Sequence, residues 1–482
     1  MSEAGPRSGI SEDWAAVWLG LFIFLLSLGA LAGADLLGWS AKPEVWISLD
    51  KALGAVSSAS TVSPVLSLAA TILFVLIVMA VGARMLGADV RRFVVAFAAL
   101  LAIAYVCWIV GHYAYIAATT DKLGKFGISW SMSLTGEAGY IVALIVGLVI
   151  ANFFKPLAEW FAPALKSEWY IKTAVVIMGA ALGVKSAEVL GLANHVILRG
   201  ICAVIEAYLV YWAVVYFIAR RYFGFAREWA APLASGISIC GVSAAIATGA
   251  AIRARPIVPI TVSSLVVIFA VIELLLLPFL ARQFLYEEPM VAGAWMGLAV
   301  KTDGAALASG AIAESLIRGK ALAEQGINYA EGWILMATTT TKVFIDVFIG
   351  VWAFILAIVW AAKIEPRSSD RPRAAEIWQR FPKFVLGYVL TFLVMLLLVR
   401  VSPELADEAK KATGESNVYR QLFFVLTFLS IGMITDFRKL WQEGMGRLAA
   451  VYSLSLFGFI IWIGFVISWL FFSGIKPPLA GS

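Results

Sequence analysis

Long runs of apolar residues, separated by short polar loops, dominate the hydrophobic pattern of the chain. A helix needs roughly 20 apolar residues to cross the hydrocarbon core of a bilayer. Runs of about this length cover residues 14–37, 64–83, 93–118, 137–154, 169–184, 197–219, 228–252, 256–284, 290–315, 331–362, 378–400, 419–435 and 448–473. The pattern therefore predicts an all-α membrane protein with about 13 membrane segments.

The composition agrees with this prediction. Of the 482 residues, 62% are hydrophobic and 14% are charged, whereas an average soluble domain has about 25% charged residues. The mean hydropathy of +0.90 excludes a soluble globular protein. The apolar run 14–37 is long and lacks a small-residue cleavage site, so we predict a membrane span there rather than a cleaved signal peptide.

Basic loops predict the orientation of the chain. The loops richest in Lys and Arg are Arg84–Arg92, Arg220–Arg227, Lys363–Lys383 and Arg438–Arg447. They lie on one side if the segments alternate, and the positive-inside rule makes that side the cytoplasm. We therefore expect a cytoplasmic N-terminus and a periplasmic C-terminus in a bacterial inner membrane. These loops account for the net charge of +6 without a nucleic-acid partner.

Two segments conflict with simple alternation of spans. With simple alternation, Arg253 and Arg255 would lie in a loop outside the cell, and Glu287 and Glu288 would lie in a loop inside it. The conflict disappears if residues 228–252 enter from the cytoplasm and return, and residues 290–315 do the same from outside. This hypothesis leaves 11 full spans and two broken or re-entrant helices.

The two unusual segments also resemble each other. The Gly/Ala-rich stretch Ala244–Ala250 can be aligned with Ala305–Ala311. Secondary transporters are often built from inverted repeats whose broken helices meet around the substrate, so the pair predicts an inverted-repeat carrier fold. Alternatively, Gly241, Ala245 and Gly249 form an ordinary packing stripe between membrane helices.

The first Gly/Ala-rich segment offers groups that could bind an anion. The N-terminus of a half-helix presents free backbone N–H groups and a positive dipole end. The candidates for substrate binding are Ser238, Cys240, Gly241, Ser243 and Thr248. The alternative is that the serines donate to carbonyls of their own helix, which is common.

The second segment contains charged residues within a membrane run. A charge at the centre of a membrane helix costs roughly 2.5–3.5 kcal/mol by insertion scales, so Lys301 and Asp303 need a partner or a function. Lys301 would attract an anionic substrate, and Asp303 would be its counter-ion or a proton acceptor. The remaining candidates here are Thr302, Gly304 and Ser309. The alternative is a lysine that snorkels to an interface.

Further ionisable residues occur in long apolar runs. Lys342 and Asp346 are four residues apart and share one helix face, which predicts either a site or an internal ion pair. Glu206 and Glu273 are isolated, and removal from water favours the neutral form of a carboxyl group. We name Asp303, Asp346, Glu206 and Glu273 as candidates for ion coupling. The alternative for both glutamates is a hydrogen bond across a helix interface.

Enzyme chemistry has little support in the sequence. The chain has three cysteines and two histidines: Cys107, Cys202, Cys240, His112 and His195. Their spacing matches no metal or cofactor motif, and the sequence has no nucleophile elbow or phosphate-binding glycine loop. We therefore expect no catalytic activity, no cofactor and no metal site.

Several motifs resemble those of a known family. The run Ser235–Ala247, together with 147–152, 178–183 and 431–438, resembles the YeiH-type family of bacterial inner-membrane proteins. The resemblance also includes Lys172, Gly297–Leu298, 304–310 and Lys342, and covers about residues 137–473. It divides the chain into an N-terminal extension of three helices (1–136) and a transporter domain (137–482).

The resemblance implies a carrier that exports sulfate or a related sulfur oxyanion by alternating access. Such a carrier is distantly similar to cation–proton antiporters and bile-acid transporters, and a homodimer and a coupling proton or sodium ion fit that type. The chain has Lys301, Thr302 and Asp303 where family members often have His followed by an acid. Ile345 and Asp346 occupy the neighbourhood of a family arginine. A sodium/proton antiporter is the alternative function.

Overall fold

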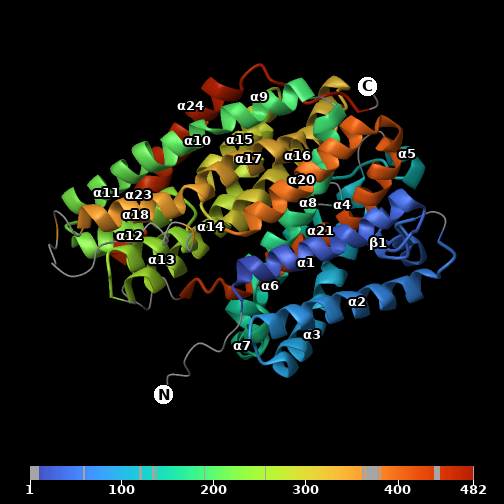
Figure 1. The fold of residues 1–482 in the computed structure, drawn as a ribbon, viewed down its shortest axis with the longest axis horizontal. Coiled ribbons are helices and arrows are strands. Elements are labelled where there is room, and N and C mark those ends of the chain that lie inside the picture. Colours follow the sequence, from blue (N-terminus) through green and yellow to red (C-terminus); the bar gives the residue numbers. More distant parts are fainter. Residues whose placement is uncertain are drawn as a thin grey trace. The chain divides into compact units, whose positions relative to one another are not determined.

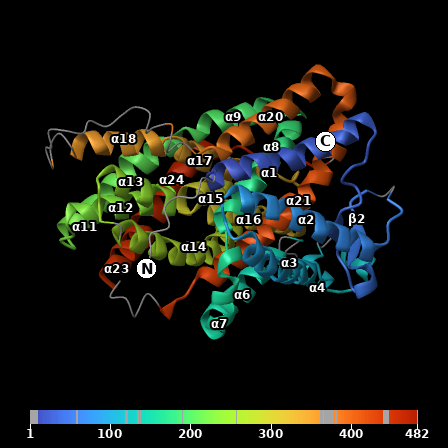
Figure 2. The same cartoon turned by 60° about the horizontal axis from the view of Figure 1, so that its bottom comes forward.

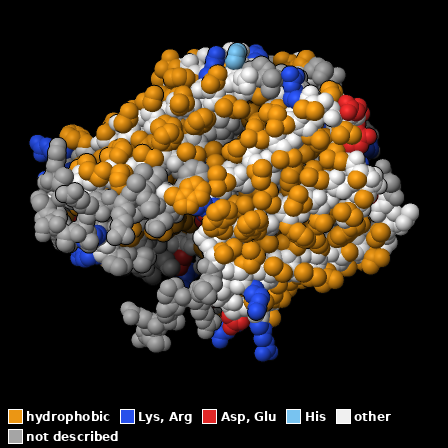
Figure 3. Space-filling view, viewed as in Figure 1, with side chains coloured by type: hydrophobic (Ala, Val, Ile, Leu, Met, Phe, Trp, Pro, Cys, Tyr) orange, Lys and Arg blue, Asp and Glu red, His pale blue; other side chains and the backbone are white. Residues whose placement is uncertain are grey.

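The computed structural model describes residues 10–57, 60–118, 122–132, 136, 138–188, 190–255, 257–360, 364, 378, 382–438 and 446–480. The basic loops 363–383 and 438–447 therefore lie largely outside the described residues. Within the described part, ten helices are long and apolar enough to cross a membrane, or eleven if one bent pair counts as a span. Hydrophobic side chains cover much of the face shown in Figure 3. The all-α membrane fold is confirmed.

The chain forms two compact units, Met1–Ala193 with Lys383–Ile434, and Asn194–Pro382 with Thr435–Ser482 (Figure 1). These units do not follow the division at residue 136, which stays a prediction. The main helices of the first unit are α1 (Glu12–Ser27), α2 (Pro64–Met85), α3 (Val90–Gly111), α6 (Ala138–Phe153), α7 (Lys155–Phe161), α8 (Ser167–Glu188), α20 (Phe384–Val401) and α21 (Ala406–Ile434). Its shorter elements are η1 (Leu28–Ala32), β1 (Ala41–Pro43), η2 (Leu49–Lys51), β2 (Leu53–Ala55), α4 (Ala114–Ala117), α5 (Leu123–Phe126), η4 (Ala162–Ala164) and η7 (Pro403–Leu405).

Glycines hold the helices of the first unit close together. A Cβ atom on Gly147 of α6 would lie 2.8 Å from the Cα of Gly432 in α21, and one on Gly179 of α8 would lie 2.4 Å from the carbonyl oxygen of Tyr388 in α20. Close backbone approach is the usual way in which membrane helices gain packing energy. The motif glycines at 147, 179 and 432 therefore serve helix packing.

A sharp bend follows α6, where the hydrophobic pattern predicts only a simple span. The axes of α6 and the α7–η4 segment differ by 117°. Pro156 lies in the first turn of α7, a position that needs no N–H donor. Leu157 and Trp160 are exposed, as expected for a short helix that lies along a membrane surface.

The second unit contains the Gly/Ala-rich segments. Its elements are α10 (Cys202–Val204), η5 (Ile205–Tyr211), α11 (Trp212–Arg221), α12 (Arg227–Ser238), α13 (Val242–Ala251), α14 (Ile257–Phe284), α15 (Pro289–Ala299), α16 (Asp303–Gln325), α17 (Trp333–Val347), α18 (Ile349–Val359), α23 (Gly446–Ser455), η8 (Leu456–Ile460) and α24 (Ile461–Phe472). Helix α9 (Leu190–Gly200) includes the boundary between the units.

Helices α12 and α13 form a hairpin and lie side by side in Figures 1 and 2. The backbone N–H of Arg255 donates to Glu228 over 2.7 Å although the residues are 27 positions apart. A straight helix would separate them by about 40 Å. Halfway along the hairpin, the Thr248 hydroxyl donates to Ser235 Oγ over 2.7 Å. The break between the two helices lies within the predicted re-entrant segment.

Helices α15 and α16 form a second hairpin. Gln325, at the end of α16, donates to Glu287 just before α15 over 3.3 Å, and Lys320 Nζ lies 4.1 Å from the ring centroid of Tyr286. Helix α14 connects the bases of the two hairpins. Its 28 residues measure about 42 Å at 1.5 Å per residue. The hairpins therefore extend from opposite ends of α14 toward each other.

Small residues fix α17 against the second hairpin. A Cβ atom on Gly297 of α15 would lie 2.0 Å from Thr341 Oγ1 and 2.6 Å from the carbonyl oxygen of Thr338, both in α17. One on Gly310 of α16 would lie 2.4 Å from Thr338 Oγ1. The Thr338 hydroxyl also donates to the Gly293 carbonyl over 2.7 Å. The position of α17 thus depends on these glycines.

We predict that Gly297→Ala destabilises the protein. The added methyl group would overlap backbone and hydroxyl atoms, and overpacking of this kind costs about 1–3 kcal/mol. The control is Gly414→Ala in α21, because a Cβ atom there meets nothing within 4 Å and alanine favours a helix over glycine. Thermal unfolding in detergent should show a lower midpoint for Gly297→Ala only. Equal midpoints for Gly297→Ala and the wild type would contradict the packing.

Candidate functional site

The tips of the two hairpins meet inside the second unit. The first tip is Ile239–Gly241, and the second is Val300–Thr302. Gly241 has φ +68°, and a Cβ atom there would lie 3.0 Å from Thr302 Cγ2 and 3.1 Å from the Lys301 carbonyl oxygen. Glycine is therefore required by its backbone conformation and by the close approach. We call this region the tip contact.

Lys342 of α17 connects the two tips. Its Nζ atom lies 3.0 Å from the Ile239 carbonyl oxygen and 3.3 Å from the Lys301 carbonyl oxygen. It also lies 3.6 Å from Asp303 Oδ1. An ammonium group has three donors, so these groups satisfy it while it is 1% exposed. A positive charge at the end of α12 also complements the carbonyls there.

Acidic groups gather around the Lys342 ammonium. Cys240 Sγ and carboxylate oxygens of Asp303 and Asp346 all lie within 4.8 Å of one another. Asp303 opens α16, where a negative charge is favourable, and Thr302 caps this helix by accepting from the Ala305 N–H over 3.2 Å. The counter-ion of Asp303 is therefore Lys342 rather than Lys301. Although the sequence predicts no metal site, these three side chains form one group in the described part of the chain that could hold a cation.

Lys301 is fully buried and does not snorkel. Its Nζ atom donates to the Leu298 carbonyl at the end of α15 and lies 4.4 Å from the ring centroid of Tyr211. Its backbone N–H donates to Glu273 Oε2 over 2.9 Å, and Tyr452 donates to Glu273 Oε1 over 3.1 Å. Glu273 thus holds the second tip to α14.

Glu206 lies within range of electrostatic interaction with Lys301. It belongs to η5, a π-helical turn in a longer helix, and such turns are frequent at functional sites. Its carboxyl group is fully buried, with Tyr211 of the same turn beside it. The structure therefore brings Glu206, Glu273, Lys301, Lys342, Asp303 and Asp346 into one buried region.

The predicted hydroxyl groups divide into two sets. Ser238 and Ser309 are fully buried, and their hydroxyls have no hydrogen-bond partner among the described residues, so neither bonds back to its own helix. Ser243 and Gly304 lie in the first turns of α13 and α16. Thr248 instead binds α13 to α12 through Ser235. It lies almost two turns from the first tip.

Several residues that support the site are not among those predicted from the sequence. Tyr208 donates to the Ile345 carbonyl over 2.5 Å, and Tyr452 holds Glu273. Glu314 of α16 accepts from the N–H groups of Gly332 and Leu335, the latter over 2.7 Å, at the start of α17. Glu314 could have been predicted from the sequence, because it is an acidic residue within a membrane run. The tyrosines carry no such signal, because aromatic residues are common throughout the chain.

The charges of the region limit what it can bind. Two ammonium groups face four carboxyl groups, so the region is negative when all six are ionised. Both ammonium groups already have acceptors in this conformation. The region can therefore accept protons or a cation as it stands. It can accept an anion once protonation of the carboxyls leaves the lysine charges in excess.

We predict that Lys342→Met strongly destabilises the second unit. The substitution leaves the buried carboxylate of Asp303 without its partner, and breaking a buried ion pair costs about 3–5 kcal/mol. The double variant Lys342→Met/Asp303→Asn removes both charges and should regain part of the loss. Unfolding of both variants in mixed micelles measures the effect. A double variant that is no more stable than Lys342→Met would show that the pair does not hold the tips.

Comparisons with known proteins agree on one family. The model described as Conserved hypothetical protein 698 matches residues 96–451. A UPF0324 membrane protein of Nitrosomonas europaea is 45% identical over 475 residues, which cover 97% of each chain. Another of Nitratidesulfovibrio vulgaris is 30% identical over 75% of this chain and 56% of its own length. No solved structure matches the chain.

Proposed function

The chain belongs to the family described as Conserved hypothetical protein 698, whose relatives are UPF0324 membrane proteins, and we propose that it is a secondary active transporter. The observation that carries the proposal is the tip contact, in which two opposed hairpins meet at a lysine. Broken helices that meet in this way are the usual substrate and ion sites of secondary transporters. We do not propose catalysis. The proposed location is the bacterial inner membrane, with the N-terminus in the cytoplasm and the C-terminus in the periplasm.

Alternating access follows from the opposite directions of the hairpins. Each hairpin covers the tip contact from one end of α14, so displacement of one hairpin would open the contact toward one side of the membrane only. Lys342 binds both tips through backbone carbonyls. Loss of the negative charge on its partner Asp303 would weaken this contact between the two tips. The same side chains would then couple ion binding to opening.

The proposed cargo is sulfate or a related small sulfur oxyanion. The resemblance to the YeiH-type family provides this class of substrate. Helix α13 begins at the tip contact without a side-chain cap, so its N–H groups could bind an oxyanion. The hydroxyl of Ser238 lies one residue before the first tip and lacks a hydrogen-bond partner in the described part of the chain. Lys301 and Lys342 would supply the positive charge.

Proton coupling would make the region suitable for an anion. When Asp303 is ionised it competes with an oxyanion for the Lys342 ammonium. Protonation removes this competitor and reduces the repulsion from the cluster with Asp346. Protonation of Glu206 and Glu273 would in the same way remove two carboxylates that compete with an oxyanion for the Lys301 ammonium. We therefore expect protons and the oxyanion to move in the same direction.

A specific observation favours a second candidate, a sodium/proton antiporter. The Lys342 ammonium lies against a carboxylate and two backbone carbonyls. Oxygen ligands of this kind suit hard metal cations. A sodium ion could displace the ammonium group and take its place. In this alternative, Asp303 and Asp346 would bind sodium and protons in turn, and no oxyanion would be required.

We predict that sulfate transport depends on Asp303. Purified protein in proteoliposomes should move radiolabelled sulfate, and an enclosed pH dye should report proton movement in the same direction. Asp303→Asn should strongly reduce proton-coupled transport, because an amide side chain cannot take up and release a proton as a carboxyl group does. The control is Glu324→Gln, an exposed acid on the same helix that pairs with Lys320 at the surface.

Two results would contradict the oxyanion proposal. One is sulfate transport by Asp303→Asn that equals that of the wild type and the control. The other is proton movement that follows a sodium gradient in the absence of sulfate, which would support the antiporter instead. Lys301→Ala distinguishes the two further, because only the oxyanion account expects this variant to lose sulfate binding.

A further inference from the structure

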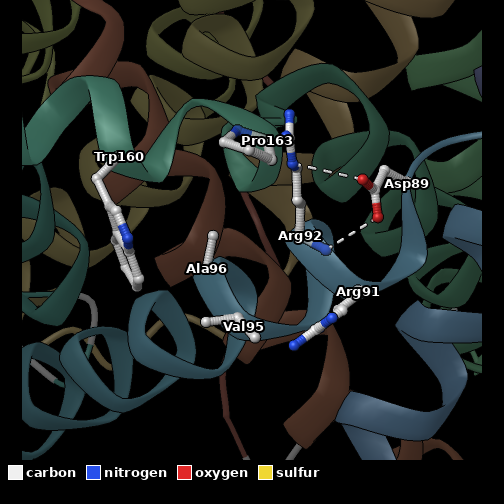
Figure 4. A pocket seen from close by; sticks show the side chains of 7 residues that line it. All are labelled: Asp89, Arg91, Arg92, Val95, Ala96, Trp160 and Pro163. Atoms are coloured by element: carbon white, nitrogen blue, oxygen red, sulfur yellow. Dashed lines mark hydrogen bonds and ion pairs between the residues drawn. The ribbon is translucent and has the colours of Figure 1, made fainter.

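The first unit contains a groove whose residues are distant in sequence from the tip contact. It has a volume of about 530 Å³ and is lined by Asp89, Arg91, Arg92, Val95, Ala96, Trp160 and Pro163. Figure 4 shows Trp160 on one side and Arg91 and Arg92 on the other, with Val95 and Ala96 between them. The groove therefore combines an apolar floor with basic groups at its edge.

The surrounding helices place this groove at the boundary of the membrane. Helix α3 begins at Val90, and the α7–η4 segment turns away from α6 by 117°. The residues around this bend expose large apolar side chains, with Phe153 75%, Leu157 43% and Trp160 48% exposed. Apolar side chains on a short surface helix insert among lipid headgroups and the first part of the acyl chains. Tryptophan prefers this depth.

The charged groups at the edge match a phosphate. The side chain of Arg92 is 81% exposed and lies 3.5 Å from Asp89 Oδ2, which is itself 58% exposed. Ion pairs this exposed contribute little, so the guanidinium group can exchange its carboxylate for a phosphate. Arg91 is also exposed beside it. Arginine binds phosphate oxygens in a bidentate manner, and the first turn of α3 adds a positive dipole end.

We propose that this groove binds the headgroup of an anionic phospholipid. The phosphodiester would bind the Arg92 guanidinium group, Arg91 would add positive charge at the edge of the groove, and the start of an acyl chain would lie along Val95, Ala96 and Trp160. The loop Arg84–Arg92 is one of those that the positive-inside rule assigns to the cytoplasm, and basic pockets between membrane helices on that side bind anionic headgroups. A phospholipid bound here would connect α3 with the α7–η4 segment.

The test is native mass spectrometry of the full chain, titrated with dioleoyl phosphatidylglycerol or dioleoyl phosphatidylethanolamine. Wild type should retain the anionic lipid preferentially. Arg91→Gln/Arg92→Gln should weaken its binding roughly 25-fold, because each basic side chain near the surface contributes about fivefold. The control is Arg221→Gln/Arg227→Gln, which removes two exposed arginines elsewhere. Equal retention by the groove variant and the control would overturn the proposal.

A second variant tests the same site by a substitution that should strengthen lipid binding. Asp89→Asn removes the carboxylate that competes for Arg92 but keeps a side chain that can cap α3, so it should bind phosphatidylglycerol more tightly than wild type. Weaker binding by this variant would contradict the role of Arg92. Glycerol 3-phosphate, a phosphate ester without acyl chains, should not compete at equal concentration. Equal competition would identify a soluble phosphate ester as the ligand instead.

Discussion

The buried ammonium group of Lys342 is the interaction on which the second unit depends. It binds carbonyl oxygens at both hairpin tips and a carboxylate at the start of α16. A lysine that is 1% exposed is stable only if such groups replace its water. Three features position this one group: the glycines against which α17 packs, the Glu314 carboxylate that caps the start of α17, and the positive φ of Gly241. The two hairpins would otherwise end in unsatisfied backbone groups.

The same constraint connects structure with transport. A helix end inside a membrane presents backbone groups without partners, and these groups must be satisfied by protein, water or ligand. In the conformation described here, Lys342 satisfies the end of α12 and Lys301 satisfies the end of α15. In the proposed cycle, protons and cargo would take over part of this role. A site that is stable when closed and changes its charge on protonation has the properties that a coupled carrier needs.

Much of the fold could be predicted from the sequence, because apolar runs and basic loops follow from the thickness and polarity of the bilayer. The unusual charges at Arg253 and Glu287 single out two segments, and the structure breaks the helix in each of them; re-entry into the membrane stays a prediction. The bend after α6 was missed, since the hydrophobic pattern does not register the direction of a short helix. Lys301, Asp303 and Lys342 could be identified because buried charge is rare. Their pairing could not, because it depends on contacts between α16 and α17, 39 residues apart in sequence.

The most direct measurement of the central claim uses Cys240, which lies at the first tip and is 2% exposed. The other two cysteines, Cys107 and Cys202, would be replaced by alanine, so that Cys240 is the only thiol. A membrane-impermeant thiol reagent would then be applied to right-side-out and inside-out vesicles. Alternating access at the tip contact predicts modification from both sides, with rates that change when sulfate is added at constant pH. Modification from neither side, or from one side under all conditions, would contradict the account.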